Sequence, residues 1–175
     1  MKRLLFATAL LLAACAGTPP PDAPRTVAAV ELPRYLGTWY EIARLPNSFQ
    51  DRRGRECEAV TATYTARPDG RIGVLNRCDD RGVQRDAEGH AYAVEGSGNA
   101  RLRVSFFWPF YGDYWVIGLD PEYRWAVVGD PEREYLWVLS RTPAMAAEDY
   151  ARAVGIARAE GFAVERLRPT RQGGG

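Results

Sequence analysis

Few side chains in this sequence combine reactive chemistry with an informative spacing, and the first to consider are His90, Cys57 and Cys78. Because His90 is the only histidine, a Ser-His-Asp relay or a haem axial ligand would depend on it alone, and no nucleophile motif surrounds it. Cys57 and Cys78 are too far apart for a CxxC redox motif or a zinc site. We therefore expect a protein that is not an enzyme and needs no metal or cofactor, with His90 as a surface or sheet residue.

A third cysteine, Cys15, closes a leader-like segment. Two basic residues precede an apolar run over residues 4–14, which is too short to span a bilayer. Residues 12–15 (LAAC) resemble the bacterial lipobox, which implies that Cys15 becomes the N-terminus and carries acyl chains that anchor it to a membrane. Ala16 stands where an inner-membrane retention signal places Asp, so we expect the outer membrane, with the domain facing the periplasm. The alternative is ordinary secretion, with Cys15 incidental.

Such a compartment is oxidising, which favours a structural disulfide between Cys57 and Cys78, and two free thiols are the alternative. The length of 175 residues suits one domain. The charge is nearly balanced, with 23 basic and 22 acidic residues, so the chain has no basic excess for binding nucleic acid.

The sequence divides into four parts. We expect a signal peptide over residues 1–14, the lipidated cysteine with a flexible proline-rich tether over 15–31, one domain over 32–169 and a disordered tail over 170–175. Within the domain, turns rich in Pro and Gly separate short β-rich runs. These runs cover residues 38–44, 59–66, 71–78, 87–95, 100–107, 113–120, 125–129 and 135–141. Eight short strands at near-regular spacing predict an antiparallel sandwich or barrel.

One helix should follow the last strand. Thr142 can cap it, Pro143 suits its first position and Gly161 can end it. Its apolar face is formed by small and aromatic residues at helical spacing: Ala146, Tyr150, Ala153 and Ala157. A last short run over residues 162–167 precedes the tail.

Alternation within the strands indicates how they are covered. In the run over residues 100–107, Leu102, Val104 and Phe106 form one apolar face, and Arg101, Arg103 and Ser105 form the other, wet face. The runs over 113–119 and 135–139 carry bulky apolar residues on both faces, so each face needs cover. A barrel with a filled or ligand-holding interior and one amphipathic helix outside supplies both.

Three motifs then occur in order. Gly37 and Trp39 resemble the Gly-x-Trp signature on the first strand of lipocalins, and residues 43–49 and 76–78 look like the bacterial, apolipoprotein-D-like branch of that family. Asp120 and Tyr123 match the second lipocalin motif, although the residues that flank Asp120 depart from it. Residues 136–143 resemble the third motif, which contains Arg141.

This resemblance, over residues 32–169, implies an all-β fold: an eight-stranded antiparallel up-and-down lipocalin barrel with one C-terminal α-helix packed outside. It also implies that Arg141 packs against Trp39 and plugs one end of the barrel. A guanidinium can stack on an indole while donating to backbone carbonyls, which suits such a plug. The alternative is a plain core aromatic and an unrelated surface arginine.

The resemblance further implies a protein that binds an apolar ligand, and we expect fatty acids or lysophospholipids, stored or transported for membrane maintenance. The expected lining consists of Leu102, Val104, Phe106, Tyr114, Val116, Tyr135 and Trp137, each of which could instead be core filling. Arg52, Arg53 and Arg55 could pair with a phosphate headgroup at the barrel mouth, or simply form a solvated loop. A homodimer is a further candidate assembly.

Two other classes of protein stay open. One is an enzyme on the same fold, with a free Cys57 or Cys78 as a nucleophile inside the barrel. The other is an envelope scaffold whose barrel is packed solid and whose partner is a protein.

Overall fold

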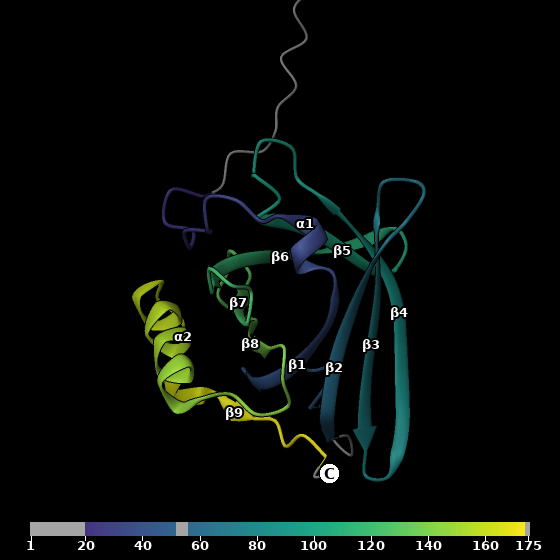
Figure 1. Cartoon of the computed structure of the whole chain (residues 1–175), viewed down its shortest axis with the longest axis vertical. Helices are drawn as coiled ribbons and strands as arrows, with labels where there is room; N and C mark the ends of the chain where they lie inside the picture. The colour runs from purple at the N-terminus through teal and green to yellow at the C-terminus, as the bar shows by residue number, and fades with distance from the viewer. Residues whose placement is uncertain (1–19, 52–55, 174–175) are drawn as a thin grey trace, which may run out of the picture.

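The computed structural model describes residues 20–51 and 56–173. Eight antiparallel strands follow one another in space in their sequence order, and β1 pairs with both β2 and β8, which closes the sheet into a barrel (Figure 1). The strands are β1 (Gly37–Arg44), β2 (Cys57–Ala66), β3 (Ile72–Asp80), β4 (Val83–Ala93), β5 (Arg101–Phe107), β6 (Phe110–Leu119), β7 (Trp125–Gly129) and β8 (Leu136–Ser140). The expected eight-stranded barrel is confirmed.

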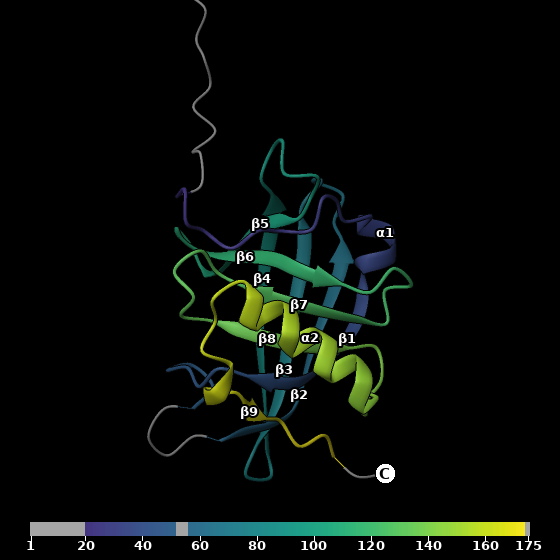
Figure 2. The ribbon, with the colours of Figure 1, turned by 90° about the vertical axis from the view of Figure 1, so that its left-hand side faces the viewer.

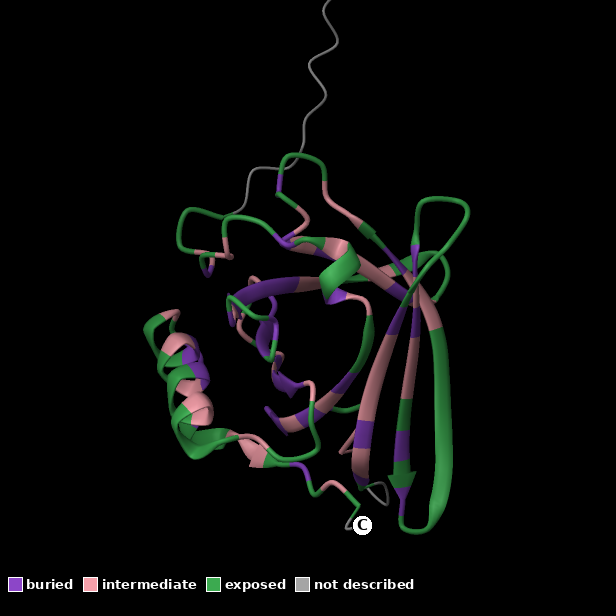
Figure 3. Cartoon of the chain, in the orientation of Figure 1, coloured by how far each residue is buried: buried purple, intermediate pink, exposed green. Residues whose placement is uncertain are grey.

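One long helix, α2 (Ala147–Ala159), packs on the outside of the barrel across β6, β7 and β8 (Figure 2). Ala153 and Ala157 face the barrel and are fully buried, whereas the outer face of the helix is exposed (Figure 3). This arrangement is the external helix that the sequence predicts.

The predicted start of this helix is wrong. Thr142 donates its hydroxyl to the carbonyl of Ala144 (2.6 Å) and its backbone N–H to the Ser140 hydroxyl (3.2 Å), so it holds a bend and caps nothing. The helix begins after Ala146, which offers no side-chain cap. Its end is as expected, because Gly161 takes a left-handed φ of 86° and Phe162 returns a backbone hydrogen bond to Ala157 (3.0 Å).

The segment after the helix also differs from the expectation of one short run. Val164–Arg166 form a 3-10 turn, and Val164 is buried against the barrel beneath the helix. The two-residue strand β9 (Arg168–Pro169) then pairs with Ala43 and Arg44 of β1. The chain therefore returns to the first strand at its end.

The segments expected to be free on either side of the domain are attached to it where they are described. Val27 donates its N–H to the carbonyl of Val116 (2.9 Å), and Val30 is buried, so residues 20–31 are not a flexible tether. At the other end, Thr170 is buried and donates its N–H to Ile42 (2.9 Å), which corrects the expectation of a tail disordered from residue 170. Backbone hydrogen bonds and apolar burial hold both segments.

Two large hydrophobic clusters lie on the two faces of the sheet, and a third, small one consists of Cys57, Val60 and Cys78. The inner core fills the barrel and includes Trp39, Tyr64, Val74 and Val116. The helix-side core lies between the sheet and α2 and includes Trp115. Consecutive residues of β6 thus enter different cores, which explains why that strand is apolar on both faces.

Candidate functional site

One end of the barrel is closed by a plug built around Trp39, whose side chain is fully buried. The short helix α1 (Leu32–Tyr35) precedes β1, and the indole N–H of Trp39 donates to the carbonyl of Tyr35 (2.8 Å). The guanidinium carbon of Arg141 lies 3.8 Å from the centre of the indole, and its two terminal nitrogens donate to the carbonyls of Thr38 (3.0 Å) and Arg34 (2.6 Å). The expected stacking of Arg141 on Trp39 is confirmed.

Gly37 is needed at the first position of this plug. Its φ is 93°, and a β-carbon there would lie 3.4 Å from a terminal nitrogen of Arg141. A side chain would therefore be strained in this backbone conformation, although its β-carbon would lie at ordinary contact distance from the guanidinium. Burial lowers the pKa of Arg141, and the nearby phenols of Tyr35 and Tyr114 oppose that shift.

The second motif forms the turn between β6 and β7 beside the plug. The carboxylate of Asp120 is buried and accepts from the backbone N–H groups of Glu122 (3.0 Å) and Arg124 (3.2 Å). Burial alone would raise the pKa of Asp120, but the hydrogen bonds from the Arg124 side chain and backbone hold it below its usual value. Tyr123 accepts the N–H of Glu31 at its hydroxyl (2.8 Å), so this turn fastens the segment that leads into α1.

Most of the predicted lining lies in the barrel interior. Six residues belong to the inner core or pack against it: Leu102, Val104, Phe106, Tyr114, Val116 and Trp137. Tyr135 lies outside this cluster and stacks on Trp137, with ring centroids 5.9 Å apart. The alternation read from β5 therefore gives the correct inward face, although its outward Ser105 is buried and not wet.

Near the plug, three phenols share hydrogen bonds inside the barrel. The hydroxyl of Tyr114 lies 2.8 Å from that of Tyr35 and 2.9 Å from that of Tyr64. Burial raises the pKa of Tyr64 to about 12 and also raises the pKa of Tyr35 and Tyr114, so all three stay protonated at neutral pH. On the same inward face of β3 as Val74, the side-chain oxygen of Asn76 is buried with no hydrogen-bond partner among the described residues. Its hydrogen-bonding capacity is therefore unused by the described residues.

At the opposite end of the barrel, a charged network that the sequence did not reveal fastens the loop after β1. Arg44 is fully buried and donates to Glu41 (2.6 Å) and to both carboxylate oxygens of Asp51 (2.9 and 2.5 Å). Burial alone would raise the pKa of Asp51, but the hydrogen bonds from Arg44 and the backbone of Asn47 hold it below its usual value. The pKa of Arg44 is raised despite its burial, because these two carboxylates hold its charge.

This network reaches the aromatic side chain of Trp137 through Gln50. Its amide donates to Glu41 (2.7 Å) and accepts from the indole N–H of Trp137 (3.0 Å). Phe49, half exposed, lies 5.5 Å from Tyr135 between ring centroids. The mouth of the barrel is thus lined by an amide and three aromatic rings.

Cys57 and Cys78 form a disulfide between β2 and β3, with sulfurs 2.10 Å apart. Neither is therefore the free thiol that an enzyme with a cysteine nucleophile requires. His90 lies in β4, half buried, and its ring nitrogen is 2.8 Å from the hydroxyl of Tyr111. Cys15 and the cluster of Arg52, Arg53 and Arg55 lie outside the described residues.

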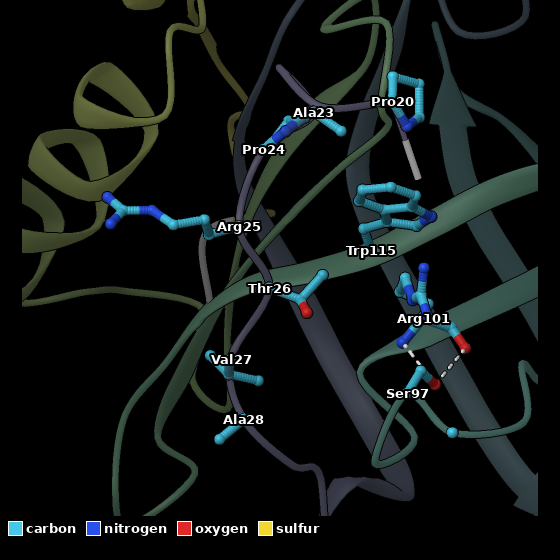
Figure 4. A pocket seen from close by; sticks show the side chains of 11 residues that line it. Pro20, Ala23, Pro24, Arg25, Thr26, Val27, Ala28, Ser97, Arg101 and Trp115 are labelled. Carbon is cyan, nitrogen blue, oxygen red and sulfur yellow. Dashed lines mark hydrogen bonds between the residues drawn. The ribbon is translucent and has the colours of Figure 1, made fainter. Parts of the chain in front are cut away.

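A hollow of about 490 Å³ lies outside the barrel, between residues 20–28 and the strands β5 and β6 (Figure 4). Trp115 and Arg101 form its wall on the barrel side, and the guanidinium carbon of Arg101 is 5.6 Å from the centre of the indole. Arg25 turns away from it and pairs with Glu160 (2.8 Å). Because Trp115 belongs to the helix-side core, this hollow is separate from the interior.

Two features are absent from residues 20–51 and 56–173. No cluster of three or more His, Cys, Asp or Glu side chains there is arranged to hold a metal ion. No helix in this part of the chain is long and apolar enough to cross a bilayer.

A closed eight-stranded barrel with an external helix, a Gly-x-Trp strand and an arginine stacked on its indole defines a lipocalin. The model of the lipocalin-like domain matches residues 30–172, so the chain belongs to the lipocalin family. Over 161 residues it is 46% identical to the outer membrane lipoprotein Blc of Escherichia coli K12, covering 91% of this chain and 89% of that protein. It is 42% identical to temperature-induced lipocalin-1 of Arabidopsis thaliana over 154 residues, or 83% of this chain and 81% of that one.

Solved structures of distant sequence share the fold. Insecticyanin of the tobacco hornworm is 16% identical, with a TM-score of 0.68 over 88% of this chain and 86% of its own. Lobster apocrustacyanin A1 is 15% identical, with a TM-score of 0.65 over 89% of this chain and 93% of its own.

Proposed function

We propose that this lipocalin is a lipid-binding lipoprotein of the outer membrane, which stores or transports fatty acids or lysophospholipids for membrane maintenance. In this proposal Cys15 is acylated and holds the domain facing the periplasm. Names of relatives such as outer membrane lipoprotein Blc support the location. The positive Arg52, Arg53 and Arg55 would hold the phosphate of a lysophospholipid, and two copies could form a homodimer around the ligand.

The observation that carries the proposal is the chemistry of the inward face. Leu102, Val104 and Val116 present apolar surface, whereas the polar groups are concentrated at the two ends, in the tyrosine cluster and at Gln50. A single-chain lipid has the same division, with an apolar body and a polar head. Burying its chain yields about 0.8 kcal/mol per methylene before ordering costs, which is sufficient for micromolar binding.

The test places a carboxylate inside the barrel. Val104→Glu would leave an unpaired charge beside the acyl chain, and we expect at least tenfold weaker binding of a lysophospholipid. Trp137, at the mouth, reports binding by fluorescence quenching. Thr65→Glu is the matched control, because Thr65 is exposed on the outward face of β2, and its affinity should equal that of the wild type.

The wild-type domain must first be freed of lipid. If it then shows neither quenching nor calorimetric heat with any single-chain lipid, the carrier proposal fails, and an envelope scaffold with a solid barrel takes its place. If Val104→Glu stays folded and binds as the wild type does, the ligand does not occupy this part of the interior.

A further inference from the structure

The connection between β5 and β6 carries three large aromatic side chains in water. Phe107 and Trp108 are each 79% exposed and Phe110 is 76% exposed. None of them belongs to the inner core or the helix-side core. Leaving a side chain of this size in water forgoes about 1.5–3 kcal/mol of burial, and a contiguous exposed patch of this kind marks an interaction site. We call Phe107, Trp108, Pro109 and Phe110 the aromatic tip.

The aromatic tip lacks charge. Residues 104–112 contain no Asp, Glu, Lys or Arg. The nearest charged side chains on either side, Arg103 and Asp113, form an ion pair with each other (2.7 Å). A partner of the tip therefore needs an apolar interior and no particular charge.

More amphipathic rings continue from the tip along the outer face of the barrel. Tyr111 lies 5.4 Å from Tyr92 and 5.6 Å from His90, measured between ring centroids. Tyr92 is 43% exposed. Rings with a polar edge prefer the boundary between headgroups and acyl chains, whereas Phe side chains enter more deeply. The order along this hairpin, with Phe at the end and Tyr and His behind, matches the profile of a bilayer.

From these observations we propose that the aromatic tip inserts into the surface of a phospholipid bilayer. A turn between two strands is convex, and soft lipid can accommodate a protruding wedge that a flat protein surface cannot. Under the proposed function the acylated Cys15 also keeps the domain near a membrane, because Cys15 precedes Pro20, the first described residue, by only five positions. The chain between them extends at most about 3.6 Å per residue.

Insertion would have a consequence for exchange of the ligand, which rests on the proposed function. In an up-and-down barrel the connections after β1, β3, β5 and β7 lie at the same end, and here that end is opposite the Trp39 plug. The tip is therefore part of the mouth. A docked mouth would let a single-chain lipid pass between bilayer and barrel without exposing its acyl chain to water. Such exposure would cost about 0.8 kcal/mol per methylene.

The experiment uses the chain from Ala16 onward, which retains every described residue, and neutral phosphatidylcholine vesicles. Of the five tryptophans, Trp108 is the one with an almost wholly exposed side chain among the described residues, so it should report insertion. We expect a blue shift of its emission and quenching by lipids brominated on the acyl chain. In Trp108→Phe both signals should be lost, while co-sedimentation with vesicles stays within twofold of the wild type.

The decisive variant is Phe107→Ser with Phe110→Ser, for which we expect at least tenfold weaker co-sedimentation. Val83→Ser is the matched control, because Val83 is 54% exposed at the turn between β3 and β4, another connection of the mouth. Its vesicle binding should be unchanged. Binding of a monomeric lysophospholipid without vesicles should be unchanged in both variants.

The inference is overturned if the wild-type chain does not co-sediment with vesicles, or if the double serine variant binds them equally well. It is also overturned if the double variant only converts a dimer into a monomer, because the tip would then be an interface between two copies. Absence of lysophospholipid binding by the wild-type chain would instead contradict the proposed function. The vesicle experiment would still test whether the aromatic tip inserts into a bilayer.

Discussion

Arg141 is the clearest place to test the energetics of the fold. Replacing it by alanine removes two hydrogen bonds to the carbonyls of Thr38 and Arg34 and the stacking of its guanidinium over Trp39 at 3.8 Å. A hydrogen bond from a charged group contributes about 1.5–3 kcal/mol, and a cation–π contact contributes about 0.5–2 kcal/mol. Because Arg141 is only half buried, water can replace part of these interactions, so the low end of each range applies. We expect Arg141→Ala to lower the free energy of unfolding by about 3 kcal/mol.

Urea denaturation measures this loss, with an unchanged m-value as the sign that the unfolded state is the same. Arg141→Lys keeps the charge and can keep one of the two hydrogen bonds but loses the planar stacking, so the drop in its free energy of unfolding should be about half as large. Arg152→Ala is the control, since Arg152 is 69% exposed on α2 and its ion pair with Asp149 is a surface pair. A loss below about 1 kcal/mol for Arg141→Ala would refute the role of this plug in stability.

Three other predictions concern chemistry elsewhere in the chain. Reduction of the Cys57–Cys78 bond, which spans 21 residues, should lower the free energy of unfolding by about 3 kcal/mol, and equal melting temperatures of the two forms would contradict this. Cys15→Ala should abolish incorporation of labelled palmitate, and any label left on the variant would remove the anchor from the proposal. Burial raises the pKa of Asp130 from 3.8 to about 6, so the folded state holds this proton more tightly and stability from this group falls as pH rises through that interval. Asp130→Asn keeps the acceptor for the Tyr135 N–H (2.7 Å) and should melt progressively higher than the wild type between pH 4 and 7; a constant difference would contradict this account.

The barrel could be predicted because its strands carry local signals. Turns such as Arg67-Pro68-Asp69-Gly70 separate the runs, and Leu102, Val104 and Phe106 alternate with polar residues on a strand that has one face inside. The plug could be predicted only through the family resemblance, because nothing local connects Trp39 to a residue 102 positions away. Long-range pairs of this kind depend on closure of the whole sheet.

The predictions from sequence are wrong where contacts with distant parts of the chain decide the local conformation. Residues 83–86 are exposed and, apart from Val83, polar, so the projecting start of β4 gave no alternating pattern, yet pairing with β3 extends the strand there (Figure 3). Thr142 and Pro143 suit a helix start, but Thr142 is already occupied in the bend after β8. Residues 20–31 are rich in Pro and Ala and resemble a linker, although backbone groups of the barrel hold them. In each case the competing partner is far away in sequence.

The charged network around Arg44 at the mouth also depends on partners that are distant in sequence, and the sequence alone did not predict it. An arginine at the end of a strand usually indicates a solvated edge, because Arg is rarely buried without partners. Arg44 is fully buried because each of its five N–H groups has an acceptor: two go to Asp51 and the others to Glu41, Thr170 and the carbonyl of Cys57. These acceptors come from the strand β1, the loop after it, the start of β2 and the C-terminal segment. The barrel therefore closes one end with a cation stacked on an indole and holds the loop at the other end with a buried ion network, which Gln50 connects to the indole of Trp137 at the mouth.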